Sequence, residues 1–304
     1  MSPFIPGLVH TPVTPFRPEG GVDPERYAQL IEFHIKHGAD ALALAMHAGE
    51  SVSLSDGEQQ DLLELALKQA KGRVPVIAHV SDSGSEIAAD RARRAERAGA
   101  AAVVATTPYY WTPPPAMVLE HFAIIGSAVK IPFLVLYSPQ EMGGTKLSTD
   151  LVLQLMDRVP NFAGLVDTSL DWQFMINIVS NAQRKNAAFQ LLSGTEYMIP
   201  AGAIGAKSAF SALAGIAPTL VRKLYDLCRA ERYADALPIQ EEIAALRQAV
   251  KRAGSSGLKA AMRVMVRDCG ETRPPLDPIA ANVFKKLAAE LAARPALGVE
   301  PRGW

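Results

Sequence analysis

Short apolar segments alternate with segments of helical periodicity along most of the chain, and this alternation limits the fold more than any other feature. Strands that are separated by helices pair in parallel through right-handed crossovers. Eight such strands close most simply into a (β/α)8 barrel, also called a TIM barrel, which is the fold we predict. The expected strands are Gly7–Phe16, Ala41–Met46, Val74–Val80, Ala101–Thr107, Pro132–Ser138, Phe162–Ser169, Phe189–Ser193 and Lys207–Ala212.

Local signals support the helices of this pattern. Asp23 and Pro24 are an N-cap followed by a first-turn proline, and Gly38 and Gly99 stand where helix C-caps are expected. An open doubly wound sheet is the alternative, but the segment after the first strand lacks a Gly-rich phosphate turn. The expected helices are Pro24–His37, Ser55–Lys71, Ser83–Arg97, Ala116–Val129, Ser148–Val159, Trp172–Ala182, Glu196–Ala203 and Pro218–Ala230.

More helices follow than a barrel needs for closure. The segments Tyr233–Arg252, Gly257–Val266 and Pro278–Ala293 all have helical patterns. We therefore divide the chain into a barrel, residues 1–230, and a C-terminal helical extension, residues 231–304, that packs on the barrel.

Charge and cysteine content limit the partners and the compartment. The chain has 31 Lys and Arg and 31 Asp and Glu residues, so its formal net charge is zero and no basic stripe suggests nucleic acid. No apolar run approaches the length of a membrane span. Cys228 and Cys269 lack metal-ligand spacing and fit reduced thiols. We expect a cytoplasmic protein that binds neither nucleic acid nor a membrane.

Candidate site residues lie where the predicted strands end, because barrel enzymes carry their chemistry at the carboxyl ends of the strands. His47 follows strand two, Tyr110 follows strand four, Tyr137 ends strand five and Thr168 ends strand six. Imidazole and phenol suit proton transfer, although each of these groups could also serve packing alone. No ligand spacing around His47 indicates a metal, so we expect neither a metal nor a cofactor.

A set of short motifs resembles one enzyme family. The chain is similar to the dihydrodipicolinate synthase and N-acetylneuraminate lyase superfamily, whose motif order it follows over most of its length. The motifs are Thr14-Pro15-Phe16, Gly21-Val22-Asp23, Gly49-Glu50-Ser51, Pro108-Tyr109-Tyr110, Leu136-Tyr137, Gly164-Leu165-Val166-Asp167-Thr168-Ser169 and Arg273-Pro274-Pro275-Leu276.

The resemblance implies a tetramer of (β/α)8 subunits in which pyruvate or another 2-oxo acid forms a Schiff base with a lysine on strand six. It also implies that Tyr137 relays protons and that Tyr110 enters the site of a neighbouring subunit. A Thr-Thr pair after strand two holds the carboxylate of the 2-oxo acid in the family. The likeness therefore predicts a homo-oligomer, either a dimer or a tetramer, with a small 2-oxo acid or related carboxylate as ligand.

The chain departs from the family at this pocket. Val166 stands at the position of the Schiff-base lysine, and His47 and Ala48, before Gly49, replace the two threonines. Lys207 is the only lysine predicted on a barrel strand. It is a candidate for a displaced nucleophile, although a side chain at the lower rim of the barrel is the stronger interpretation.

Two hypotheses follow. The protein is either a lyase, aldolase or synthase type of enzyme that acts on a small 2-oxo acid or related carboxylate, or a catalytically silent paralogue that binds a small metabolite or a partner subunit. In the first case we expect His47 and Tyr137 to be the working pair, with Tyr110 from a neighbouring subunit. The ligand would contact Ala48, Gly49, Val166, Thr168 and Lys207.

Overall fold

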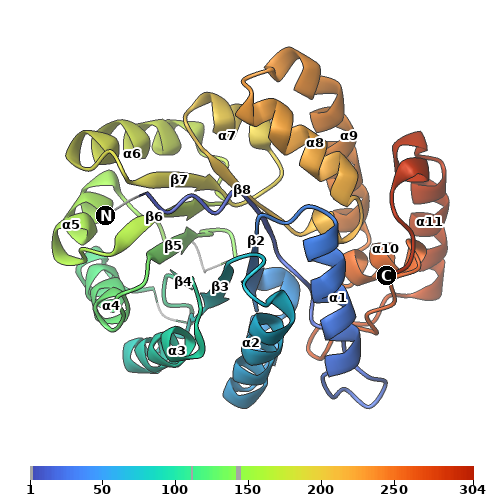
Figure 1. Ribbon diagram of the computed structural model, residues 1–304, viewed down its shortest axis with the longest axis horizontal. Coiled ribbons are helices and arrows are strands. Elements are labelled where there is room, and N and C mark those ends of the chain that lie inside the picture. Colours follow the sequence, from blue (N-terminus) through green and yellow to red (C-terminus); the bar gives the residue numbers. More distant parts are fainter. Residues whose placement is uncertain (1–2, 111, 142–144) are drawn as a thin grey trace.

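A computed structural model describes residues 3–110, 112–141 and 145–304. Its centre is a closed barrel of eight parallel strands in sequence order, with helices between them (Figure 1). The prediction of a (β/α)8 barrel is therefore confirmed. The strands are β1 Leu8–His10, β2 Ala41–Leu44, β3 Val76–His79, β4 Ala102–Thr106, β5 Phe133–Tyr137, β6 Phe162–Asp167, β7 Gln190–Ser193 and β8 Ser208–Ser211.

The start of α1 and the end of α3 coincide with predicted signals. Asp23 accepts a hydrogen bond from the Arg26 N–H and Pro24 is the first residue of α1, while Gly99 caps α3 with a φ of 100°. Around the barrel lie α1 Pro24–Lys36, α2 Asp56–Ala70, α3 Ser85–Ala98, α4 Pro115–Ser127, α5 Thr149–Arg158, α6 Trp172–Lys185, α7 Met198–Ala203 and α8 Pro218–Arg229, followed by α9 Tyr233–Arg252, α10 Gly257–Val264 and α11 Ala281–Ala292. Four 3₁₀ helices, which the sequence did not reveal, are η1 His47–Gly49, η2 Ser51–Ser53, η3 Leu213–Gly215 and η4 Pro295–Val299.

Several strands are shorter than predicted. The first strand ends at His10, because Pro12 and Pro15 cannot donate to a strand ladder. The second ends at Leu44, where Ala45 turns the chain with a φ of 51°. The eighth begins at Ser208, so the prediction that Lys207 lies on a barrel strand was wrong.

Side chains of the strands alternate between two apolar layers. One layer fills the barrel interior, and the other lies between the strands and the surrounding helices. Gly164 allows β6 to pack closely against β7. Any larger residue would clash there, because its Cβ atom would lie only 2.3 Å from the Gln190 carbonyl oxygen. The interior layer contains Val9, Ala41, Ala43, Met46, Ile77, Ala102, Val104, Leu134, Leu136, Val166, Leu192 and Phe210.

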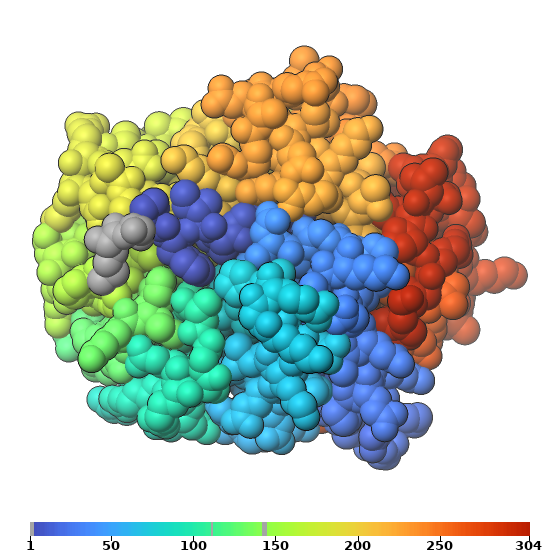
Figure 2. All heavy atoms as spheres, in the orientation of Figure 1, coloured from blue at the N-terminus to red at the C-terminus, as the bar shows by residue number. Residues whose placement is uncertain are grey.

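The C-terminal helices pack on the side of the barrel next to α1 and α8 (Figures 1 and 2). Side chains of α8, α9, α10 and α11 share one apolar cluster with α1. Arg267, which follows α10, is fully buried and donates to the carbonyl oxygens of Gly215, Ile216, Pro301 and Gly303 at 2.7–3.1 Å. These bonds hold the C-terminal segment against the loop after β8.

Candidate functional site at the carboxyl end of the barrel

Val166 lies in the interior of the barrel and is 0% exposed. It pairs in register with Leu136 of β5 and Leu192 of β7, which face the same interior. At this level the barrel is therefore aliphatic on three adjacent strands. Valine carries no ionisable or nucleophilic atom, so the side chain at this point of β6 cannot form a Schiff base.

Hydroxyl groups follow one step further toward the carboxyl ends of the strands. Thr168 comes two residues after Val166, and Ser138 comes two residues after Leu136. Because every second residue of a strand lies on the same side, both are on the side that faces the barrel interior. The Thr168 hydroxyl donates to the Ser138 hydroxyl at 2.9 Å and lies 3.1 Å from the Tyr137 carbonyl oxygen. The mouth of the barrel is thus polar directly above an apolar floor.

His79 and Ser81 add a hydrogen-bonded pair to this polar level, and sequence reasoning did not find them. His79 ends β3 on the inward side, two residues after Ile77. Its Nε2 lies 2.7 Å from the Ser81 Oγ, which also accepts the Thr106 N–H at 2.8 Å. Burial lowers the pKa of His79 to about 4, and the positive charges of Arg91 and His47 contribute. Counting by two from Ile77 along the predicted third strand would have placed His79 on the inward side, and Ser81 follows one residue beyond that strand.

His47 opens the 3₁₀ helix η1 after β2, and its side chain is exposed. Ala48 is half-buried and Gly49 is buried, with its carbonyl oxygen accepting the Thr14 hydroxyl at 2.7 Å. His47 thus follows β2, which pairs with β3, the strand that ends in His79.

Tyr137 faces away from the barrel interior. Its ring lies 4.8 Å from that of Phe174 in α6, and it belongs to the layer between strands and helices. Burial and the nearby Asp167 carboxylate raise its pKa. In the described part of the chain no hydrogen bond joins Tyr137 to His47, so the pairing of these two residues stays a prediction.

Tyr110 and Lys207 lie apart from the interior. Tyr110 follows β4 with a φ of 81° and is 89% exposed, while the neighbouring Trp111 falls outside the described residues, as does 142–144 in the loop after β5. Lys207 is exposed before β8, and its carbonyl oxygen accepts the Tyr225 hydroxyl. Its position agrees with a lysine at the rim of the barrel and not with an interior nucleophile.

A buried ion pair connects the loop after β2 to the C-terminal helices. The Lys259 Nζ in α10 lies 2.6 Å from the Glu50 Oε1, and both side chains are almost fully buried. The same ammonium donates to the Glu271 carbonyl oxygen at 3.0 Å and lies 4.2 Å from the centre of the Phe16 ring. With these contacts Lys259 is a structural cation. The pattern of residues around Lys259 does not indicate this role, because Glu50 and Phe16 are more than 200 residues earlier in the chain.

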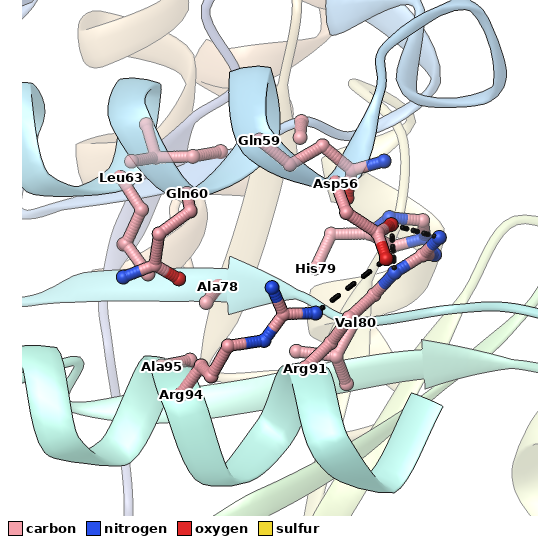
Figure 3. A pocket seen from close by; sticks show the side chains of 12 residues that line it. Asp56, Gln59, Gln60, Leu63, Ala78, His79, Val80, Arg91, Arg94 and Ala95 are labelled. Atoms are coloured by element: carbon pink, nitrogen blue, oxygen red, sulfur yellow. Dashed lines mark hydrogen bonds and ion pairs between the residues drawn. The ribbon is translucent and has the colours of Figure 1, made fainter. Parts of the chain in front are cut away.

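A small cavity lies outside the barrel, between α2, α3 and β3 (Figure 3). Asp56 of α2 pairs there with Arg91 and Arg94 of α3, at 2.6 and 3.6 Å. Its volume of about 30 Å³ suits a water molecule and excludes an organic carboxylate. Within residues 3–110, 112–141 and 145–304, no cluster of three or more His, Cys, Asp or Glu side chains suits a metal, and no helix is long and apolar enough to cross a membrane.

The sequence profile of the dihydrodipicolinate synthetase family matches residues 5–294. The chain belongs to this family. It is 31% identical over 286 residues to the 4-hydroxy-tetrahydrodipicolinate synthase of Nitratidesulfovibrio vulgaris, covering 92% of this chain and 95% of the relative. The 4-hydroxy-tetrahydrodipicolinate synthase of Rhodopseudomonas palustris is 32% identical over 295 residues, which cover 95% of this chain and 97% of the relative.

Solved structures of the dihydrodipicolinate synthetase family share the whole architecture. The dihydrodipicolinate synthase of Acinetobacter baumannii superposes with a TM-score of 0.90 at 26% identity, covering 97% of this chain and all of that one. The dihydrodipicolinate synthase of Aquifex aeolicus gives a TM-score of 0.88 at 27% identity, and the superposition covers 94% of this chain and 97% of that one. The likeness that the motifs indicated is confirmed over nearly the entire chain.

Proposed function

We propose that the protein binds and transforms a small 2-oxo acid or a related carboxylate at the carboxyl end of the barrel without forming a Schiff base. The observation that carries this proposal is Val166, which is buried in the interior of β6. Imine formation needs an amine that loses its proton near neutral pH in a dry site. Valine cannot supply one, whereas the hydroxyls and the imidazole above it can bind a carboxylate.

The ligand class is supported by the relatives. Two proteins that are at least 31% identical over nearly the whole chain are 4-hydroxy-tetrahydrodipicolinate synthases, and the Acinetobacter baumannii structure is a complex with pyruvate. The hydroxyl groups of Thr168 and Ser138 above the aliphatic floor are chemically suited to binding a small carboxylate.

Synthase turnover tests this proposal. We expect very low condensation of pyruvate with aspartate semialdehyde, because general acid–base catalysis of about 10²–10⁴-fold does not replace a covalent step. Binding of pyruvate or another 2-oxo acid in calorimetry, with negligible condensation, would agree with a non-covalent site. Robust turnover that is lost in Lys207→Ala would contradict it, and the absence of any carboxylate binding would favour a catalytically silent paralogue.

His47 and Tyr137 are the proposed working pair of this site, and because the Tyr137 ring packs against Phe174 outside the interior, its hydroxyl would have to reach the ligand from the rim of the barrel. Imidazole in place of a threonine hydroxyl keeps a donor and an acceptor at the end of β2 and adds a group that titrates near neutrality. We expect His47→Ala and Tyr137→Phe each to abolish ligand binding with little change in melting temperature, measured by calorimetry and circular dichroism. Unchanged binding in both variants would remove the pair from the site.

The protein is further proposed to be a cytoplasmic homo-oligomer. Tyr110 is the residue that the family resemblance places in a neighbouring subunit, and its side chain is 89% exposed in the single chain. An aromatic side chain with this exposure is suited to a subunit interface.

A further inference from the structure

Two buried polar atoms near the mouth of the barrel have no hydrogen-bond partner among the described residues. They are the His79 Nδ1 and the Thr106 Oγ1, and the Thr106 side chain is only 1% exposed. Both residues lie on the inward side of adjacent strands, since Ile77 on β3 and Val104 on β4 face the interior two residues earlier. Buried polar groups without partners are rare and indicate a missing water or ligand.

The hydrogen bonds around Ser81 decide which nitrogen of His79 carries the proton. The Ser81 Oγ already accepts the Thr106 N–H, and its own proton has the His79 Nε2 as a neighbour at 2.7 Å. If Ser81 donates to Nε2, only the Nδ1–H of the ring lacks a partner. If Nε2 carried the proton instead, the Ser81 hydroxyl and the bare Nδ1 would both lack one. The first arrangement leaves fewer buried groups unsatisfied, so His79 is assigned as the Nδ1–H tautomer.

We propose that the His79 Nδ1–H and the Thr106 hydroxyl are an anchor for a carbonyl or carboxylate oxygen of the ligand, held in place by Ser81. This inference rests on the proposed function, because it names the part of the site that replaces the covalent link. His79 and Thr106 are binding residues that touch the ligand, and Ser81 is a positioning residue that acts through the His79 ring.

The chemistry of the anchor selects an oxygen acceptor and not a cation. The imidazole N–H is a donor, and the Thr106 hydroxyl can donate as well. The nearby guanidinium of Arg91 favours an anion, and because burial lowers the pKa of His79 to about 4, the ring itself stays neutral at pH 7. A neutral imidazole that donates to a carbonyl oxygen can also polarise it without proton transfer.

A matched histidine–serine pair outside the barrel serves as the control. The His121 Nδ1 in α4 lies 2.9 Å from the Ser85 Oγ in α3, and the ring approaches the backbone of Thr106 but not its hydroxyl. Burial lowers the pKa of His121 to about 4, as it does for His79. The two pairs thus share their chemistry and differ in location, the His121 pair lying in the helical layer.

The test is calorimetric titration of pyruvate into the protein and its variants His79→Leu, Thr106→Val and His121→Leu. We expect His79→Leu and Thr106→Val each to weaken pyruvate binding about tenfold, as the loss of one hydrogen bond to a charged or polarised oxygen does. His121→Leu should bind like the parent. Thr106→Val keeps the side-chain shape. Its binding therefore decides the test if circular dichroism shows that His79→Leu is unfolded.

A second readout follows the ring directly. In protein labelled with ¹⁵N-histidine, the His79 signals should show the Nδ1–H tautomer, and the Nδ1 signal should move on addition of pyruvate while His121 stays fixed. Pyruvate binding that is unchanged in both site variants, with a fixed His79 signal, would overturn the anchor and leave the proposed function standing. No binding of pyruvate or any other 2-oxo acid, with no shift at His79, would overturn both.

Discussion

At the scale of single residues, Asp167 is a carboxyl group that the fold removes from water. Its side chain is 0% exposed, and its Oδ2 has no partner among the described residues, although the Ser169 N–H and hydroxyl donate to Oδ1 at 2.7 Å. Burial raises the pKa of Asp167 to about 6. The folded protein therefore holds a proton on Asp167 over a pH range in which the unfolded chain has lost it.

This difference predicts a dependence of stability on pH. Because the pKa of Asp167 is higher in the folded state than in the unfolded chain, its contribution to the free energy of unfolding depends on pH. That contribution is fully present below about pH 4 and is lost as the pH rises through about 6. The loss is on the order of 2–3 kcal/mol at 1.36 kcal/mol per pKa unit. Asp167→Asn keeps an oxygen acceptor for Ser169 and removes the titrating group. Its free energy of unfolding, measured in urea, should equal that of the parent protein at pH 4 and exceed it at pH 7.5.

The control for this variant is Asp171→Asn. It removes one negative charge from an exposed position and keeps the N-cap of α6, because asparagine caps as well as aspartate. Greater destabilisation of Asp167→Asn at pH 7.5 than at pH 4 would contradict the assignment, since it would mean that the folded state needs the ionised carboxylate.

At the scale of elements, the Lys259–Glu50 pair joins α10 to the loop that follows β2. Replacing one member of a buried pair leaves the other charge without compensation, at a cost of roughly 3–5 kcal/mol. We predict that Lys259→Met lowers the free energy of unfolding by about that amount. Denaturant unfolding followed by circular dichroism measures it.

Arg263→Met on the same helix is the matched comparison. Arg263 pairs with Glu271 at 2.8 Å, but both side chains are about one-third or more exposed. A pair of this kind contributes about 0–1 kcal/mol. Equal losses in the two variants would show that burial does not set the strength of the Lys259 contact.

The elements also show how far the sequence predicts this structure. Periodicity and capping residues such as Asp23 and Gly99 identify all eight strands and their helices, because those signals are local. The motif around Val166 predicts a change at the site, and this interpretation stays a prediction. Lys259 was missed because its ion-pair partner Glu50 comes from a distant segment, whereas His79 was missed although strand alternation places it on the inward side of β3. The packing of Tyr137 on α6 was also not foreseen, since the direction of a side chain depends on the inward or outward side of its strand.

At the scale of the whole molecule, the segment after β4 predicts self-association. Tyr110 is 89% exposed and Met117, near the start of α4, is 61% exposed. Exposed apolar side chains of this size are typical of interfaces. We predict the mass of a dimer or a tetramer in sedimentation at micromolar concentration, and a shift toward monomer for Tyr110→Asp. A monomeric parent protein would remove the reason to place Tyr110 in a neighbouring site.

The absence of a strand-six amine is the central claim, and borohydride trapping tests it most directly. The protein is incubated with pyruvate, reduced with borohydride and measured by intact mass, beside a family member that retains the strand-six lysine. The buried Val166 predicts an unchanged mass for this protein and a pyruvate adduct for the comparison. A stoichiometric adduct, mapped by peptide fragmentation to Lys207, Lys259 or any other lysine, would contradict the account.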